Sequence, residues 1–484
     1  MKNLTVKRSG IMLYPDRTRV LLRPFHFMSD QRAMTICTQV MALPEGEVHT
    51  LLDQLLADFN ERHLKLREFL RRRFEEVRPY LSRGLQLSEN RELLLGAYFS
   101  HEYSHEGAAL FNPSIVPHPD QSGIPPGSLR FILSLRATGE GHISSINFRA
   151  GALDATAHIT IDAASRYSLV PAPVTRATYE KHVFERKLDE PGLSGGFSRQ
   201  VLKALGERFT LNELRSSVSL ALKQLRTPNL ETEAVARDIL TLAQSNYEVK
   251  FEPDSLLSER VLFPATPSQS NGIEDARFVL FEGEDGRRTY YATYTAYDGR
   301  LIQPQFLETS DFLHFKFITL SGPAVQNKGM ALFPRTIKGR YAMLGRQDSE
   351  NIYVMFSDHL HFWHTKQPVL QSAFPWEFIQ LGNCGSPIET EAGWLVLSHG
   401  VGAMRKYCIG AFLLDRDDPT KMIGRLREPL IKPSEDEREG YVPNVVYSCG
   451  ALLHGRQLTI PYAMSDYATT FATVSLDEML AAMQ

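Results

Sequence analysis

A short hairpin of aromatic- and aliphatic-rich strands recurs along the chain, and this repeat restricts the fold more than any other feature. Each copy ends in a polar or charged residue, and most are followed by a turn and a second strand. Another short strand with a polar start precedes each copy. Three strands per unit, used five times, predict an all-β fold, a five-bladed β-propeller. The copies begin at residues 129, 289, 340, 393 and 457.

Two stretches with apolar residues at three-to-four spacing separate the first copy from the second. Residues 199–226 and 231–245 predict a helical hairpin. We expect it to form an insertion of about 185–247 between blades 1 and 2. The insertion explains why about one hundred extra residues lie between these two copies, whereas later copies are about 50–60 residues apart, near the length of one blade.

The N-terminal part of the chain also has a helical pattern. Residues 47–81 are amphipathic and predict one long helix that ends near Pro79. We therefore expect an N-terminal strand and long helix segment over 1–95 and a catalytic propeller over 96–484. The long helix offers a surface for a homodimer.

Composition and charge exclude several classes of function. The 484 residues are 43% hydrophobic and 23% charged, with a formal net charge of −3, which is typical of a globular enzyme and disfavours nucleic acid as a partner. No apolar stretch of about 18 residues and no apolar leader is present, so we expect a cytoplasmic protein with no membrane contact. Four cysteines, none in a CxxC pair, are too few for a disulfide framework or a cysteine zinc site.

Polar residues at the strand starts and ends are predicted to converge at one mouth of the propeller, because loops and strand ends of a rigid scaffold commonly carry binding residues. Cations and carboxylates together suit a ligand with both an anionic group and hydroxyls. The alternative for any one residue is a salt bridge that closes a blade. The set is Asn112, Arg136, Glu274, Asp275, Arg277, Asn327, Lys328, Arg346, His399, Asn444, Tyr462 and Asp466.

Over roughly residues 100–484 the chain resembles glycoside hydrolase family 130, the mannoside phosphorylases and related mannosidases. The family's Gly-x-Glu-Asp-Pro-Arg signature reads GIEDAR from residue 272, with Ala276 in the proline position. Four later segments are also similar to the family pattern. Its phosphate-site strand pair is matched by NKGMALFPRTIKGRYAMLGR, and its Gly-rich segment by GNCGSPIETEAGWLVLSHGV. Its Gly-Ala-x-Leu-Leu-Asp blade is matched by YCIGAFLLDRDDP, and its terminal motif by YAMSD. The first hundred residues and the helical insertion lie outside the family pattern and indicate an unfamiliar subgroup.

The resemblance implies an inverting phosphorolysis of β-mannosides that releases mannose 1-phosphate. Such a reaction needs one acid and a nucleophile on the opposite face of the sugar, and with phosphate as the nucleophile no second catalytic carboxylate is required. Asp275 is implied as the acid, acting through a sugar hydroxyl. Arg136, Lys328, Arg346 and His399 are implied as the phosphate site. Inorganic phosphate is then a co-substrate, and we expect no metal and no other cofactor.

The remaining implied site residues bind the mannoside or oligosaccharide. They are Asn112, His105, Glu274, Arg277, Tyr294, Asn327, Tyr462 and Asp466.

Hydrolysis on the same fold is the main alternative. Some family members are hydrolases in which an added glutamate activates water and the basic cluster is depleted. Glu350 is the first candidate for that base here, and Glu389 and Glu391 are others, although Glu391 lies in a turn typical of surface charge. The retained basic residues favour phosphorolysis.

Other classes of function have weaker support. Residues 101–105 match HExxH, the zinc protease motif, but the extended motif fails at Ala108 and Phe111. Residues 192–196 match GxSxG, but they follow a charged segment instead of a buried strand, which indicates a linker. A non-enzymatic propeller that serves as an interaction module is the remaining alternative, and it would need no acid beside a cationic cluster.

Overall fold

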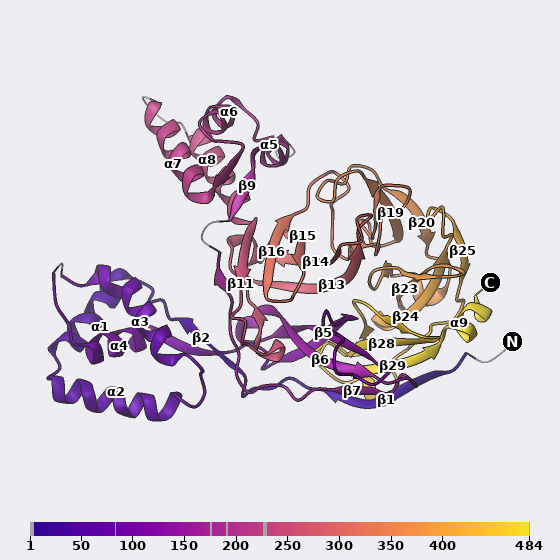
Figure 1. The fold of residues 1–484 in the computed structure, drawn as a ribbon, viewed down its shortest axis with the longest axis horizontal. Coiled ribbons are helices and arrows are strands. Elements are labelled where there is room, and N and C mark those ends of the chain that lie inside the picture. The colour runs from indigo at the N-terminus through magenta and orange to yellow at the C-terminus, as the bar shows by residue number, and fades with distance from the viewer. Residues whose placement is uncertain (1–3, 83, 175–176, 190–191, 226–229, 484) are drawn as a thin grey trace.

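The computed structural model describes residues 4–82, 84–174, 177–189, 192–225 and 230–483. Antiparallel sheets occupy most of the chain from residue 100 onward, and they lie around a common centre (Figure 1). Most of the α-helices form two blocks apart from these sheets, one near the N-terminus and one inserted at about residues 181–244, and a last helix, α9 (Leu476–Ala482), packs on the last of these sheets. None of the described helices is long and apolar enough to cross a membrane.

The first two groups of strands share one continuous sheet, because a single parallel pair, Gly272 with Ser144, joins them. The first group contains β4 (Ala109–Pro117), β5 (Leu129–Thr138), β6 (Ser144–Leu153), β7 (Ile159–Ile161) and β12 (Val261–Leu262). The second contains β13 (Gly272–Glu282), β14 (Arg288–Tyr297), β15 (Ile302–Thr309), β16 (His314–Thr319), β11 (Tyr247–Lys250) and β8 (Ala172–Pro173).

Three separate sheets follow in chain order. The third group contains β17 (Ala331–Leu332), β18 (Tyr341–Gly345), β19 (Asn351–Ser357) and β20 (Gln367–Gln371). The fourth contains β21 (Gln380–Asn383), β22 (Ile388–Thr390), β23 (Gly393–Gly402), β24 (Lys406–Leu414) and β25 (Met422–Arg425). The fifth contains β26 (Val446–Tyr447), β27 (Leu452–His454), β28 (Gln457–Met464), β29 (Ala468–Ser475) and β1 (Val6–Leu13).

The N-terminal strand β1 pairs with β29, so the start of the chain completes the last sheet. This differs from the expectation that the strand belongs with the N-terminal helices. The pairing places strands from near the two ends of the chain side by side, at the lower edge of the molecule in Figure 1. An edge strand that is paired in this way has no free backbone groups on that side.

Apolar side chains fill the space between neighbouring groups of strands. Phe148 of the first group packs edge to face on Phe278 and Phe312 of the second, and all three rings are buried. Trp394 of the fourth group packs on Phe333 beside the third. Burying one such ring contributes about 1.5–3 kcal/mol, so these contacts hold neighbouring groups at fixed positions.

The N-terminal block contains four α-helices where the sequence predicts one long helix. The predicted 47–81 helix is broken between Phe59 and Leu66, because the chain turns there, and its two halves pack on α4. The buried guanidinium of Arg91, on α4, donates to the carbonyls of Val40 and Leu43 and so holds α4 against the end of α1. The elements are β2 (Val20–Pro24), α1 (Asp30–Ala42), α2 (Glu45–Phe59), α3 (Leu66–Val77), α4 (Glu89–Tyr98) and β3 (Ser100–Ser104).

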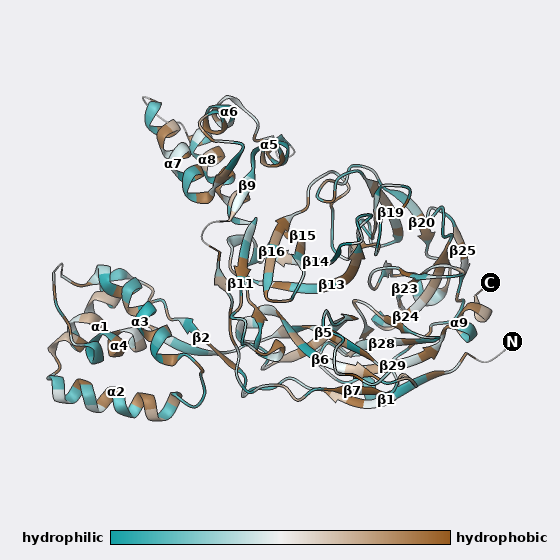
Figure 2. Ribbon diagram, viewed as in Figure 1, coloured by the Kyte–Doolittle hydropathy of each residue, from teal (hydrophilic) through white to brown (hydrophobic). Residues whose placement is uncertain are grey.

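The inserted block contains four described helices instead of the expected hairpin. It follows β8 and precedes β11, which pair with each other in the second group of strands, so the insertion interrupts that group and does not lie between it and the first. The end of the predicted 199–226 helix at Arg226 lies outside the described residues. Both helical blocks carry hydrophobic and hydrophilic residues on the same helices (Figure 2), as expected for amphipathic helices with a core of their own. The elements are β9 (Thr178–Glu180), α5 (Lys181–Asp189), α6 (Gly196–Lys203), β10 (Arg208–Thr210), α7 (Leu211–Gln224) and α8 (Leu230–Gln244).

Candidate active site

Two matching irregularities build the centre of the site. The pairing of β4 with β5 shifts register between Phe111 and Ser114, and the pairing of β13 with β14 shifts between Glu274 and Arg277. Inside the two bulges, Asn112 and Asp275 have φ values of 48° and 54°. Asn and Asp tolerate this left-handed conformation better than most residues, and strained bulges are common next to functional sites.

The bulges bring the two side chains into contact. The Nδ2 of Asn112 donates to Oδ1 of Asp275 over 2.7 Å, and both residues are buried. The Nη1 of Arg136, on β5, lies 3.4 Å from the same carboxylate oxygen. Arg136 also donates from Nη2 to Glu274 over 2.6 Å, and the Nζ of Lys328 lies 3.9 Å from the other oxygen of Glu274. Two carboxylates and two cations therefore form one cluster.

Asp275 and a second aspartate, Asp466, on which the charges of the cluster also act, have opposite proton affinities. Burial raises the pKa of Asp275, but the charges of Arg136, Lys328 and Arg277 outweigh burial and hold that pKa well below its usual range. At half-buried Asp466, burial dominates and, with the charge of Asp275, raises the pKa to about 6. Paired groups whose environments separate their pKa values are typical of acid and base chemistry.

A second basic layer lies beside Lys328. The buried guanidinium of Arg346 donates from Nε to the carbonyl of Lys328 over 3.2 Å, and its Nη1 lies 2.9 Å from Nε2 of His399. Burial and then the charge of Arg346 hold the pKa of His399 well below its usual range. Because the guanidinium can only donate, Nε2 is the acceptor and the imidazole is neutral with its proton on Nδ1. Lys328 keeps 32% of its side chain exposed and is the accessible cation of this layer.

Comparison with known proteins then places the chain. A model of glycoside hydrolase family 130, described as beta-1,4-mannooligosaccharide phosphorylase, matches residues 229–484. The chain belongs to glycoside hydrolase family 130. The resemblance inferred from the sequence motifs is thereby confirmed.

Curated relatives in the family share about a third of the aligned residues. A 1,2-beta-oligomannan phosphorylase of Thermoanaerobacter sp. is 34% identical over 231 residues, which are 46% of this chain and 75% of the relative. A beta-1,2-mannobiose phosphorylase of Listeria innocua is 31% identical over 232 residues, which are 45% of this chain and 62% of the relative. The solved structure of beta-1,2-mannobiose phosphorylase from Listeria innocua with beta-1,2-mannobiose has a TM-score of 0.46 and 20% identity, and it covers 78% of this chain and 92% of that chain.

Arg277 of the family signature lies behind the site. Its side chain is 1% exposed, and it donates to the carbonyls of Asp275 and Cys384 and to the hydroxyl of Tyr447 over 2.9, 3.1 and 2.8 Å. Because Arg277 is buried and all its contacts are to groups inside the protein, it has no surface that substrate can reach, which corrects the role expected from the sequence. It instead fixes the backbone of the bulge that carries Asp275, although Ala276 replaces the family's proline.

Three further residues assigned to substrate binding lie outside the cluster. The hydroxyl of Tyr294 is bonded to Gln269 and Gln305 in the core of the second group, and Tyr294 is 2% exposed. The hydroxyl of Tyr462 donates to Glu437 and is also buried. Both assignments are corrected, since neither tyrosine has a surface that a sugar can reach.

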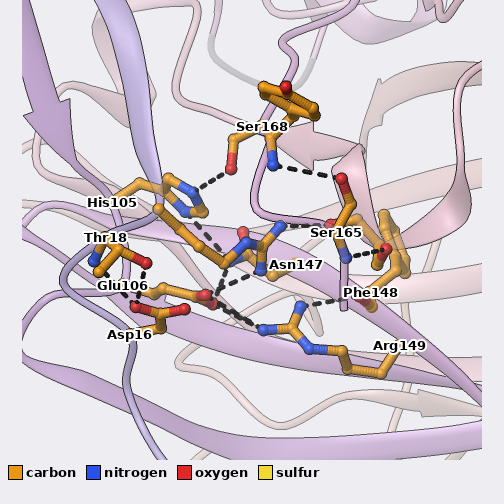
Figure 3. A network of polar contacts seen from close by, with 12 residues as sticks. Asp16, Thr18, His105, Glu106, Asn147, Phe148, Arg149, Ser165 and Ser168 are labelled. Carbon is orange, nitrogen blue, oxygen red and sulfur yellow. Dashed lines mark hydrogen bonds and ion pairs between the residues drawn. The ribbon is translucent and has the colours of Figure 1, made fainter. Parts of the chain in front are cut away.

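His105 is the third of these residues, and it belongs to a buried network with Glu106 (Figure 3). Glu106 binds Arg19 over 2.8 Å and Arg149 over 3.1 Å, while Asn147 and Ser168 contact His105 at 3.0 and 2.8 Å. Residues 101–104 of the HExxH match lie on strand β3 and not on a helix. Among the described residues no group of three or more potential ligands could hold a metal ion. The segment therefore joins the N-terminal chain to the first group of strands.

The other candidates from the sequence have structural partners. Asn327 donates to Ser349 over 2.9 Å and to the carbonyl of Arg346 over 3.2 Å, which shapes the loop that carries Lys328. Asn444, with a φ of 64°, accepts from Arg438. None of the three glutamates considered as the base of a hydrolase is both buried and unpaired. Glu350 is exposed in a turn. Glu389 pairs with Arg335 and Arg416, and Glu391 pairs with Arg456.

Sequence reasoning missed Arg405. It is exposed in the turn between β23 and β24, and both it and Met404 have positive φ values, 54° and 57°. Its charge lowers the pKa of Asp466, so it lies close enough to affect the cluster. The signal in the sequence is weak, because nothing in Gly-Ala-Met-Arg-Lys marks a strained turn of non-glycine residues.

Proposed function

We propose that this family 130 protein cleaves β-mannosides with inorganic phosphate and releases mannose 1-phosphate. The observation that carries the proposal is the contact of Asp275 with Arg136, beside the partly exposed ammonium of Lys328. The names of the relatives support it, since they are phosphorylases of 1,2-beta-oligomannan and of beta-1,2-mannobiose. Phosphate is the co-substrate, and a mannoside or oligosaccharide is the other partner.

The proposed architecture is a five-bladed propeller in which each of the five groups of strands is one blade. One cavity supports it, because residues of all five groups line about 860 Å³ of shared space, among them Val116, Phe278, Thr336, Ile388 and Leu452. The N-terminal helices and the inserted helices then lie outside the catalytic ring. Four buried free thiols fit a reducing, cytoplasmic location.

Phosphate binding supplies a reason for Asp275 to take up a proton. Arg136 holds the carboxylate ionised in the free protein. A phosphate dianion that binds Arg136 and Lys328 brings negative charge next to Asp275 and neutralises the cations, and both effects raise the pKa of the aspartate. Asp275 can then donate a proton toward the leaving oxygen through a sugar hydroxyl while phosphate attacks the anomeric carbon from the other face.

Arg346 and His399 position the phosphate site in this account. Neutral His399 accepts from Arg346 and leaves the other guanidinium hydrogens for phosphate. An arginine fork and a lysine point charge together hold a dianion and direct one oxygen toward the sugar. Asn112 and Asp466 remain the candidates for binding sugar hydroxyls.

Replacing Lys328 with alanine is expected to raise the KM for phosphate about ten- to a hundred-fold, because one charge-assisted contact is lost. The KM for the mannoside should change much less. Initial rates measured against phosphate and against mannoside separate the two constants. Lys316→Ala is the matched control, since Lys316 pairs with Glu308 on the second group of strands and should alter neither constant. An equal rise in both constants would place Lys328 on the sugar instead.

A further inference from the structure

Four aromatic rings stand in two contacting pairs at the edge of the molecule that carries Asp466. The rings of Tyr14 and Tyr467 are 6.2 Å apart, and those of Tyr441 and His142 are 5.4 Å apart. The three tyrosines are 56%, 39% and 65% exposed in the order Tyr14, Tyr467, Tyr441. Single exposed aromatics are ordinary on protein surfaces, but rings gathered from four separate segments are less so.

Strand register places these rings next to the catalytic cluster. Tyr467 follows Asp466 directly in the turn between β28 and β29. Tyr14 follows the end of β1, where Leu13 pairs with Thr469 at the same end of β29. Both rings therefore lie at the end of the fifth group that carries Asp466.

The second pair extends the same edge toward the first group of strands. The amide of Val442 donates to the carbonyl of Ser465 over 3.0 Å, so the segment with Tyr441 runs beside the turn that holds Asp466. His142 lies in the turn between β5 and β6, the two strands whose ends carry Arg136 and Ser144. The hydroxyl of Tyr441 is 3.5 Å from Nδ1 of His142 across the boundary between the fifth and first groups.

We propose that Tyr14, Tyr467, Tyr441 and His142 form an aromatic track that binds the distal sugar units of a β-linked manno-oligosaccharide. The apolar C–H face of a sugar packs on an exposed ring, while tyrosine hydroxyls and imidazole nitrogens bond its hydroxyls. The track lies beside the cluster and so acts on units beyond the cleaved bond. This inference rests on the proposed function, and it makes oligosaccharides of three or more units the preferred substrates.

The composition of the track also separates this chain from the family pattern. Tyr14 and His142 both lie outside residues 229–484, the part that the family model matches. Of the four rings, Tyr14 comes from the N-terminal part of the chain, whose β1 completes the fifth group, whereas His142 lies in the first group of strands. The track therefore makes the preference for longer oligosaccharides a property of the subgroup of family 130 that carries this N-terminal part.

The test compares phosphorolysis of β-1,2- and β-1,4-linked manno-oligosaccharides of two and five units. In Tyr441→Ala and in Tyr14→Ala, the ratio of kcat/KM for the pentasaccharide to that for the disaccharide is expected to fall about five- to ten-fold. Tyr98→Ala is the control, because Tyr98 is 44% exposed on helix α4 and should leave the ratio unchanged. An unchanged ratio in the two track variants, or an equal loss on both lengths, would overturn the proposal.

Measuring the binding of saccharides to the protein tests the track even if the protein does not carry out phosphorolysis. Calorimetry of the wild-type protein with the same saccharides should show tighter binding of the pentasaccharide than of the disaccharide, and Tyr441→Ala should abolish that difference. Melting temperatures of the variants should match the wild type, because all three tyrosines are exposed. Equal affinities for the two lengths in the wild type would overturn the track, whereas binding without cleavage in phosphate would refute only the proposed function.

Discussion

Replacing Asp275 with asparagine is expected to lower kcat for phosphorolysis by about 10²–10⁴-fold, the usual contribution of a positioned proton donor. Asparagine has the same shape, and its amide oxygen can still accept from Asn112, so the fold should be retained. Initial rates of mannose 1-phosphate release, measured together with a melting curve, separate loss of chemistry from loss of structure. The introduced amide cannot donate a proton as an acid does, whatever the charge on Arg136.

Asp466→Asn is the matched control for this experiment, because Asp466 is the other aspartate of the cluster and its pKa is raised to about 6. A group with that pKa loses its proton as the pH rises through 6, so an enzyme that used it as the acid would lose activity above that pH. We expect the Asp466 variant to change the KM for mannoside more than kcat. If it instead abolishes turnover while Asp275→Asn keeps more than a tenth of wild-type activity, the acid is Asp466.

Replacing Glu106 with alanine is expected to cost about 3–5 kcal/mol of the free energy of unfolding, the usual cost of removing one partner of a buried ion pair. Glu106 is 0% exposed and lies between Arg19 and Arg149, which are 1% and 5% exposed. Without this carboxylate, the two buried guanidinium groups lose the negative charge that Glu106 supplies. Burial raises the pKa of Glu106, but the two arginines outweigh burial and lower it, as expected for a carboxylate that they hold ionised.

The control is Glu391→Ala, which removes a surface carboxylate that also pairs with an arginine, Arg456. Water and salt screen this exposed pair, so denaturant unfolding should show little change in that variant. Equal stabilities of the two variants would mean that the Glu106 network does not hold the N-terminal chain to the first group of strands. Comparison of Glu106→Gln with Glu106→Ala then separates the lost charge from the lost volume.

The sequence repeat predicted the order of the strands well, because a strand that is half buried alternates with period two and ends at a turn residue. The helical blocks were predicted in place but not in detail. The break between Phe59 and Leu66 depends on packing against α4, a contact between residues far apart in the chain. The pairing of β1 with β29 is equally distant and left no local signal.

The structure brings together the candidate residues that the two bulges position, and it places other candidates elsewhere because their side chains point into the core. Asn112, Asp275, Arg136 and Lys328 meet because the two bulges turn Asn112 and Asp275 toward each other. Tyr294 and Tyr462 also lie near strand ends, but their side chains point into the core, and neighbouring positions on a strand face opposite sides. The hydroxyl of Tyr294 is bonded to two glutamines and that of Tyr462 to Glu437. These partners lie in other elements of the fold, so the motif around each tyrosine does not reveal that its hydroxyl is already bonded.

The most direct test of the account is the dependence of cleavage on phosphate. Purified protein is incubated with β-1,2- and β-1,4-linked manno-oligosaccharides, with and without inorganic phosphate, while mannose 1-phosphate and free mannose are measured. The account predicts mannose 1-phosphate in the presence of phosphate and no cleavage without it. Release of free mannose at the same rate in phosphate-free buffer would contradict the account, identify a hydrolase, and make Glu350 the first residue to replace.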